Sequence, residues 1–158
     1  MFNKKLADLS KWDRRYLLMA RDPISTWSKD PSTKVGAVLV RPNNTVHSTG
    51  YNGLPRGLRD DPELLADRMY KYPRTLHAEV NAILNADTRP VGCTLFIWPM
   101  PPCSHCAIQI IQSGITRVVA PEPIDRWYDS CLIGDELLQE AGVTTVWLNL
   151  EGEGLCTA

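Results

Sequence analysis

The sequence lacks any long apolar run. None of its segments approaches the roughly 18 consecutive apolar residues that a membrane-spanning helix needs, so we expect no membrane partner. Residues 1–10 mix charged and apolar side chains, without the apolar stretch of a signal peptide. These two absences favour a cytoplasmic, intracellular protein.

Neither sign of charge is in excess. The chain has 17 Lys and Arg against 18 Asp and Glu, for a formal net charge of −1. Proteins that wrap nucleic acid carry a strongly basic surface, so this balance argues against a nucleic-acid partner. With 158 residues, 44% of them hydrophobic and 22% charged, the composition excludes wholesale disorder. We expect a single domain over residues 1–158, with 151–158 as a loose tail.

The sequence also lacks an even number of cysteines, which a complete set of disulfides would need. The five cysteines are Cys93, Cys103, Cys106, Cys131 and Cys156. An odd number without a secretory signal argues against a disulfide framework and for a reducing compartment. In that setting, two cysteines three residues apart indicate metal or redox chemistry.

The order of the elements predicts an α/β fold. A helix is expected over 11–27, broken or kinked at Pro23, and a hairpin is expected from two apolar runs that flank a turn at 41–44. The expected strands are 35–40, 46–51, 93–98, 115–120 and 143–150. The expected later helices are 76–86, 103–113 and 131–141, of which the last two end before glycines. Strands that alternate with helices pair in parallel, which predicts a three-layer α/β/α domain with a mixed five-stranded sheet.

A long connection separates the hairpin from the second half. Residues 52–73 are rich in Gly, Pro and charge, and 62–71 have a helical pattern. Connections of this length in compact domains are often functional.

Two short motifs carry the chemistry. His77 and Glu79 stand at the start of one expected helix, and Cys103 and Cys106 stand at the start of the next. One imidazole and two thiolates are good zinc ligands, and the positive end of a helix dipole favours the thiolate form. Three protein ligands leave a fourth position open, which is typical of catalytic zinc. Side chains in the first turn of a helix have some latitude, so Glu79 can face the same site as His77. Glu79 is then a candidate proton shuttle beside the metal-bound water.

Two other interpretations of these motifs remain open. A Cys-x-x-Cys pair is also found in thioredoxin-like redox sites, although that would leave His77 and Glu79 without a role. A structural zinc site with four ligands would need one more side chain. The candidates for that extra ligand are His105, His47 and Cys131.

Together the motifs form His-x-Glu followed by Pro-Cys-x-x-Cys, the signature of zinc nucleobase deaminases. From about residue 12 to residue 150, the chain resembles the deoxycytidylate (dCMP) deaminases of the cytidine deaminase superfamily. Four blocks carry the resemblance: SKDPSTKVGA at 28–37, GYNGLP at 50–55, HAEVNAI at 77–83 and PCSHCA at 102–107. The last two blocks are shared across the superfamily, whereas the first two and the long connection point to the dCMP branch.

The resemblance implies a cytidine deaminase-like fold and a hydrolytic reaction at C4 of cytosine, which converts dCMP to dUMP and ammonia and supplies dUMP for dTMP synthesis. His77, Cys103 and Cys106 would bind one Zn²⁺, and Glu79 would carry protons to N3 and to the leaving amine. The residues that the resemblance places at the substrate are Asn52, Ala78, Ser28, Lys29 and Tyr128. Of these, the Lys29 ammonium is expected to meet the 5′-phosphate.

The resemblance also implies regulation. Many dCMP deaminases are homohexamers that dCTP with Mg²⁺ activates and dTTP inhibits. The residues expected at such an effector site are Gly50, Tyr51, Asn52, Gly53, Arg56 and Arg68, where the arginines are plausible phosphate partners. Residues 55–76 contain no Cys and no His, so a second zinc site in this connection is not expected.

Other functions compete with this one. Deaminases of tRNA adenosine share the zinc blocks but would be expected to have a basic surface. Deaminases of free cytosine, cytidine, guanine or dCTP are closer alternatives. A non-catalytic nucleotide-binding relative is the alternative of a different class, and the retained Glu79 argues against it.

Overall fold

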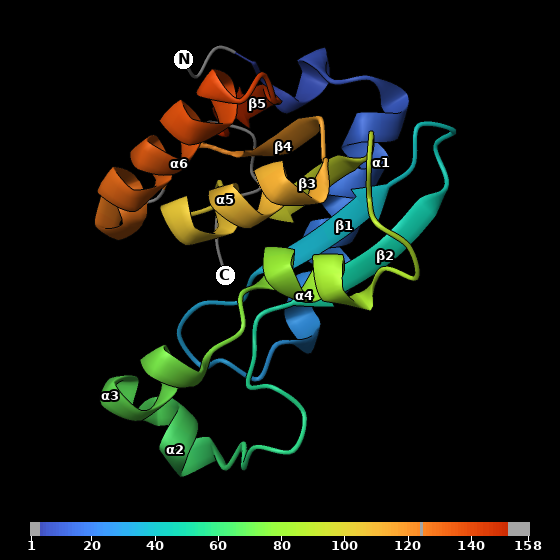
Figure 1. Cartoon of the computed structure of the whole chain (residues 1–158). Helices are drawn as coiled ribbons and strands as arrows, with labels where there is room; N and C mark the ends of the chain where they lie inside the picture. Colours follow the sequence, from blue (N-terminus) through green and yellow to red (C-terminus); the bar gives the residue numbers. More distant parts are fainter. Residues whose placement is uncertain (1–3, 124, 152–158) are drawn as a thin grey trace.

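The computed structural model describes residues 4–123 and 125–151 (Figure 1). The predicted loose tail lies outside the described residues, apart from Glu151. Five strands form one sheet in the order β2-β1-β3-β4-β5. Their bounds are β1 Gly36–Val40, β2 Val46–Tyr51, β3 Thr94–Trp98, β4 Arg117–Pro121 and β5 Thr144–Leu148.

The sheet is mixed, as predicted. Strand β1 pairs antiparallel with both β2 and β3, whereas β3, β4 and β5 are mutually parallel. All five residues of β1 are buried, because this strand has a neighbour on each side and helices on both faces. Strand β2 lies at the edge and has exposed ends.

Two layers of helices enclose the sheet, which confirms the three-layer fold (Figure 1). The helices are α1 Lys11–Met19, α2 Pro62–Ala66, α3 Arg68–Lys71, α4 Ala78–Asn85, α5 Ser104–Ser113 and α6 Tyr128–Glu140. One hydrophobic core lies between the sheet and α4, α5 and α6, and a second lies between the opposite face and α1. In β1, Ala37 and Leu39 face the first core, while Val38 and Val40 face the second. No described helix is both long enough and apolar enough to span a bilayer.

Some predicted boundaries were wrong. Helix α4 begins at Ala78 rather than at residue 76, because Leu76 instead pairs with Gly53 in an isolated β-bridge. Helix α6 begins at Tyr128, three residues before the predicted start, as a continuation of a 3₁₀ turn over Asp125–Trp127. The predicted break at Pro23 is confirmed, since the backbone of Asp22 leaves the helical region with φ −145°.

The connection between β2 and α4 forms an insert, defined here as residues 52–76. Its predicted helix is divided into α2 and α3 at Asp67, whose extended backbone and side chain cap the start of α3. Figure 1 shows α2 and α3 standing apart from the three layers, beyond the end of the sheet near the start of α4. The insert is therefore positioned to cover whatever lies at that end.

Candidate active site

The starts of α4 and α5 bring the two sequence motifs together. His77 is the N-cap of α4, Cys103 is the N-cap of α5, and Cys106 lies in the first turn of α5. The Nδ1 atom of His77 lies 3.5 Å from Sγ of Cys103 and 3.3 Å from Sγ of Cys106. The three ligand atoms all lie within 4.8 Å of one another, and one imidazole with two thiols is a donor set that suits zinc.

Glu79 belongs to the same site. The backbone of His77 is extended, with φ −72° and ψ 152°, so its side chain does not follow the helical direction that would separate it from Glu79. Glu79 is only 4% exposed. This burial raises the pKa of the Glu79 carboxyl, against the opposing effect of nearby His77. A carboxyl group of this kind is suited to accept and return a proton near neutral pH.

The electrostatics of the cluster favour a thiolate at Cys103. The Cys106 thiol, which donates to Cys103, together with His77 lowers the pKa of the Cys103 thiol to about 4. The hydrogen bond between the His77 ring and Cys103 raises the pKa of His77 to about 9. Thiolate is the form of cysteine that binds metal.

Two glycines let the site's supporting elements approach closely. A Cβ atom at Gly50 of β2 would lie 2.4 Å from the carbonyl oxygen of Ala78 and 2.3 Å from the amide nitrogen of Ala82. A Cβ atom at Gly134 of α6 would lie 2.6 Å from the carbonyl oxygen of Pro102. The residues that begin α4 and α5 are therefore held against β2 and α6 by direct backbone contact.

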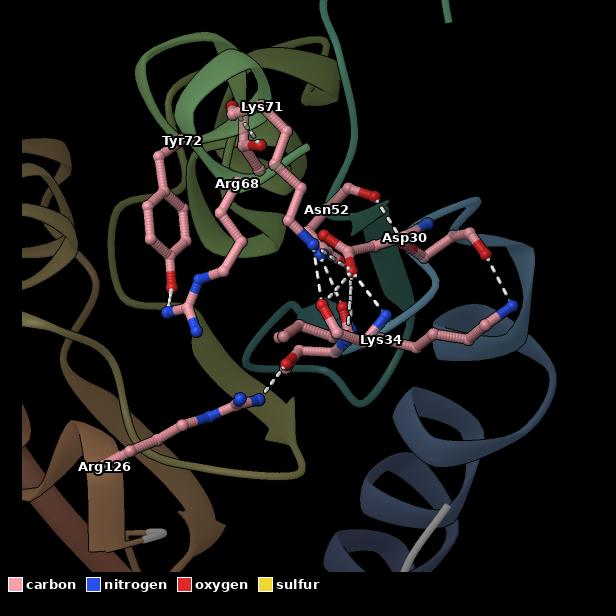
Figure 2. A network of polar contacts seen from close by, with 12 residues as sticks. Asp30, Lys34, Asn52, Arg68, Lys71, Tyr72 and Arg126 are labelled. Carbon is pink, nitrogen blue, oxygen red and sulfur yellow. Dashed lines mark hydrogen bonds and ion pairs between the residues drawn. The ribbon is translucent and has the colours of Figure 1, made fainter. Parts of the chain in front are cut away.

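A cavity of about 540 Å³ adjoins the cluster. Its walls come from the loop before β1, from the insert, from the starts of α4 and α5, and from the turn before α6. The side chains that line the cavity include Asp30, Thr33, Asn52, Arg68, Lys71, Tyr72, His77, Ala78, Glu79, Cys103, Arg126 and Trp127. The cavity thus joins the metal ligands to a rim that carries several cationic side chains (Figure 2).

The residues expected at the substrate fall into two groups. Asn52 and Ala78 line the cavity. The Asn52 side chain accepts from the Val35 amide at 2.8 Å and donates to the Thr33 carbonyl at 2.8 Å, so it also fixes the loop before β1. Ser28 is buried and donates to the Asn52 carbonyl at 2.8 Å.

Ser28, Lys29 and Tyr128 are not among the residues that line the cavity. The Lys29 ammonium is exposed and pairs with Asp60. The Tyr128 side chain is 43% exposed at the start of α6, and its neighbour Trp127 lines the cavity in its place.

The residues expected at an effector site have different surroundings in the structure. Gly50 packs against α4, Tyr51 meets the Trp27 ring edge-on at 6.2 Å, and Gly53 pairs with Leu76. Arg56 lies exposed in the insert, whereas Arg68 lines the cavity beside the metal ligands. The structure therefore brings Arg68 to the catalytic cavity rather than to a separate surface.

Several cavity residues were not anticipated from the sequence. Asp30, Lys71, Tyr72, Arg126 and Trp127 come from three segments far apart in the chain. Asp30 lies in the SKDPSTKVGA block but has no role assigned there, the other four belong to no motif, and isolated charged residues usually lie on solvated surfaces. Their common feature is a place in the tertiary structure, which no local pattern reveals.

The alternative metal ligands do not join the cluster. Within residues 4–123 and 125–151, no His, Cys, Asp or Glu beyond His77, Cys103 and Cys106 completes the group. Cys131 lines the cavity, but its thiol donates to the Pro101 carbonyl at 3.4 Å. The His47 ring contacts Asp87 at 2.9 Å, outside this site. The cluster that the described residues form therefore consists of His77, Cys103 and Cys106.

Comparison with known proteins agrees with this geometry. The family model for the cytidine and deoxycytidylate deaminase zinc-binding region matches residues 10–122. The chain is 42% identical over 147 residues to an uncharacterized deaminase in the luxG 3′ region of Aliivibrio fischeri, covering 90% of this chain and 97% of the relative. It is 36% identical over 151 residues to deoxycytidylate deaminase of Homo sapiens, and the match covers 89% of this chain and 82% of the relative.

The fold has a solved counterpart. The apo structure of dCMP deaminase from cyanophage S-TIM5 matches with a TM-score of 0.68 and 27% identity, covering 86% of this chain and 96% of the other. The same enzyme in complex with dCMP and dUMP matches with a TM-score of 0.63 and 26% identity. Because both the sequence and the fold match proteins of this kind, the chain belongs to the cytidine and deoxycytidylate deaminase family and is a hydrolytic deaminase.

Proposed function

We propose that the protein deaminates dCMP to dUMP and ammonia, in the cytoplasm, and so supplies dUMP for dTMP synthesis. The observation that carries the proposal is a His-Cys-Cys cluster with a buried Glu79, opening into a cavity whose rim holds two arginines. Named dCMP deaminases among the relatives support this substrate over other nucleobases.

His77, Cys103 and Cys106 would hold one Zn²⁺, which when bound lowers the pKa of a water molecule and makes it a nucleophile near neutral pH. Glu79 would take a proton from the attacking water, deliver it to N3 of the cytosine, and then return a proton to the leaving amine. The carboxyl group is suited to this role because it is buried and its pKa is raised. The reaction replaces the C4 amine with oxygen and releases ammonia.

The first amide of α4 supports binding of the base. Ala78 lines the cavity and is the first residue of that helix, so its N–H group has no partner within the helix. This N–H would donate to the carbonyl oxygen of the cytosine. The contact would hold C4 near the metal ligands and near Glu79.

Arg68 and Arg126 are our candidates for the 5′-phosphate, in place of Lys29. Both line the cavity, and neither forms an ion pair within the described residues. Arg68 donates to the Tyr72 hydroxyl and Arg126 to the Thr33 hydroxyl, which orients both guanidinium groups without neutralising them. Arginine is suited to phosphate because its planar fork can donate two parallel hydrogen bonds.

Regulation by dCTP with Mg²⁺ and by dTTP, in a homohexamer, is part of the same proposal. Its support is the GYNGLP block at 50–55 and the exposed Arg56, which remains a candidate effector ligand. Titration of dCTP with Mg²⁺ into a dCMP assay should increase activity at low substrate concentration, and dTTP should reverse the increase. Unchanged activity with both nucleotides would reject this regulation and leave the catalytic proposal intact.

The test of catalysis is deamination of dCMP by the zinc-loaded protein, followed by the ultraviolet absorbance change of the base. Deoxycytidine, cytidine, dCTP, cytosine and guanine provide the comparison. We expect dCMP to have the highest kcat/KM. If another compound in this set is preferred by tenfold or more, the proposed substrate is wrong.

A further inference from the structure

The most buried ion pair of the described residues lies in the wall of the catalytic cavity. The Lys71 ammonium is 2.9 Å from Oδ1 of Asp30, and the two side chains are 5% and 10% exposed. Lys71 also donates to the Ser32 hydroxyl at 2.6 Å (Figure 2). A charge buried to this extent needs a fixed partner, since an unpaired one would be strongly destabilising.

This ion pair joins two separate parts of the chain. Lys71 is the last residue of α3 in the insert, and Asp30 lies in the loop before β1. The same Asp30 oxygen accepts from the backbone amides of Ser32 and Thr33, at 2.8 and 3.0 Å. Although burial raises the pKa of the Asp30 carboxyl, these hydrogen bonds and the one from Lys71 hold it below its ordinary value. The carboxylate is therefore a rigid, charged anchor for the insert.

Besides this pair, the insert is held by the Gly53–Leu76 bridge at its base, by the exposed Lys29–Asp60 pair and by the edge contact of Tyr72 with Trp127. Helices α2 and α3 have five and four residues, and helices this short are not stable on their own. Among helices and strands they pack mainly on each other and on the turn that follows, and they stand apart from the layers of the fold (Figure 1). The Lys71–Asp30 pair is the buried charged contact between α3 and the loop before β1, so it can decide where α3 lies.

Arg68 lies on the same short helix as Lys71, three residues earlier, and residues three apart on a helix face the same side. Both side chains line the catalytic cavity. Figure 2 shows Lys71 directed toward Asp30, while Arg68 lies beside the Tyr72 ring on the side of Arg126. The Arg68 guanidinium sits 4.9 Å from the centre of that ring.

We propose that Lys71 is a positioning residue: its ion pair with Asp30 fixes α3 against the loop before β1 and thereby sets Arg68 where it can bind the substrate's phosphate. This inference rests on the proposed function, since it concerns the binding of dCMP. Lys71 itself does not carry the chemistry, since its ammonium donates to Asp30 and Ser32. Its removal should weaken substrate binding much more than it slows the chemical step.

The test is the steady-state kinetics of Lys71→Met, which keeps an unbranched apolar side chain of similar size and removes the ammonium. We expect KM for dCMP to rise by about tenfold or more, with kcat within about threefold of wild type and unchanged zinc content. The matched control is Arg59→Met, which removes a cation from the same insert. The Arg59 side chain is 78% exposed and does not line the cavity, so its KM should stay at the wild-type value.

A double-mutant cycle tests whether Lys71 acts through Arg68. Arg68→Ala alone should raise KM, and adding Lys71→Met should then raise it by less than about threefold further. If Lys71→Met raises KM equally in both backgrounds, or leaves KM unchanged in the wild-type background, the positioning role is overturned and the proposed function stands. If wild-type protein and Arg59→Met both fail to convert dCMP, the proposed function fails and this role fails with it.

A milder variant covers the case in which Lys71→Met does not fold. Ser32→Ala removes a hydroxyl that accepts from the Lys71 ammonium and donates to Oδ1 of Asp30, while it leaves the ion pair itself in place. We expect a two- to threefold rise in KM, smaller than that of Lys71→Met because the ion pair remains, and expect it to disappear in the Arg68→Ala background. A rise that persists there would contradict the proposal.

Discussion

At the scale of single residues, Glu79 is the group whose surroundings matter most. It is buried, and its pKa is raised mainly by that burial. Both features come from its place in the first turn of α4, beside the metal ligands, rather than from its own chemistry. An ordinary surface glutamate would remain ionised and would be a poorer proton carrier at neutral pH.

Glu79→Ala should keep zinc and lose turnover. Because the side chain acts on protons and is not one of the three ligands, we expect metal content to stay near one per chain. We expect kcat for dCMP to fall by about 10²–10⁴-fold. Activity within tenfold of wild type would remove Glu79 from the mechanism.

Cys103→Ala should lose the metal. The remaining His77 and Cys106 provide only two ligands, which is fewer than catalytic zinc sites use. Metal analysis after dialysis checks this result. Cys93→Ala is the control, since Cys93 is a buried cysteine that contacts His47 rather than the cluster, and this variant should retain zinc. Full zinc content in Cys103→Ala would refute the ligand assignment.

At the scale of secondary-structure elements, the site depends on how closely β2 approaches α4. Gly50 has backbone atoms of Ala78 and Ala82 where a side chain would lie, whereas Gly53 in the same sequence block has no atom within 4 Å of such a position. Two glycines that look alike in the sequence therefore have different roles. The first maintains the distance between two elements, and the second does not.

Gly50→Ala should destabilise the protein and Gly53→Ala should not. A methyl group at Gly50 must displace the start of α4, and overpacking of this kind costs about 1–3 kcal/mol of the free energy of unfolding. Urea unfolding of the zinc-loaded proteins measures the difference. We expect Gly53→Ala to change stability by less than about 0.5 kcal/mol. Equal stability of the two variants would contradict the close packing of β2 on α4.

At the scale of the whole molecule, a two-point ion pair ties the first helix to the sheet. Asp13 of α1 accepts from both terminal nitrogens of Arg117 of β4, at 2.9 and 2.8 Å. The hydrogen bond from Arg117 is the main reason that the pKa of Asp13 is lowered. Helix α1 and strand β4 both contribute residues to the second core, so the pair joins two elements that pack on that face of the sheet.

Asp13→Asn should cost about 1 kcal/mol at pH 7, a moderate value because both side chains are partly exposed. A lowered folded-state pKa gives stability that is fully present above the unfolded value of about 3.9 and is lost as the pH falls through the folded value. The difference between wild type and variant should therefore shrink below about pH 4. Unfolding midpoints from pH 7 to pH 3 measure it, with Asp60→Asn in an exposed pair as the control. A difference that is constant over this range would contradict the pair's contribution.

The sequence by itself determined the sheet, the His-Cys-Cys cluster and the position of Glu79 at the start of α4. Alternation of strands and helices predicts the fold, and the spacing in His77–Glu79 and Cys103–Cys106 predicts the cluster, because in each case the information is local. The boundaries of α4 and α6 were less well predicted, since a bridge to Gly53 and a preceding turn decided them.

The rim of the cavity was decided only by the tertiary structure. Asp30, Lys71 and Arg126 are distant in the sequence and share no motif, yet all three line the same cavity. Arg68, which we expected at an effector site, lines the catalytic cavity in the structure. Lys29, which we expected at the substrate, pairs with Asp60 and does not line the cavity. A charged residue takes its role from the partner it meets, and contacts between distant segments are set by packing rather than by local spacing.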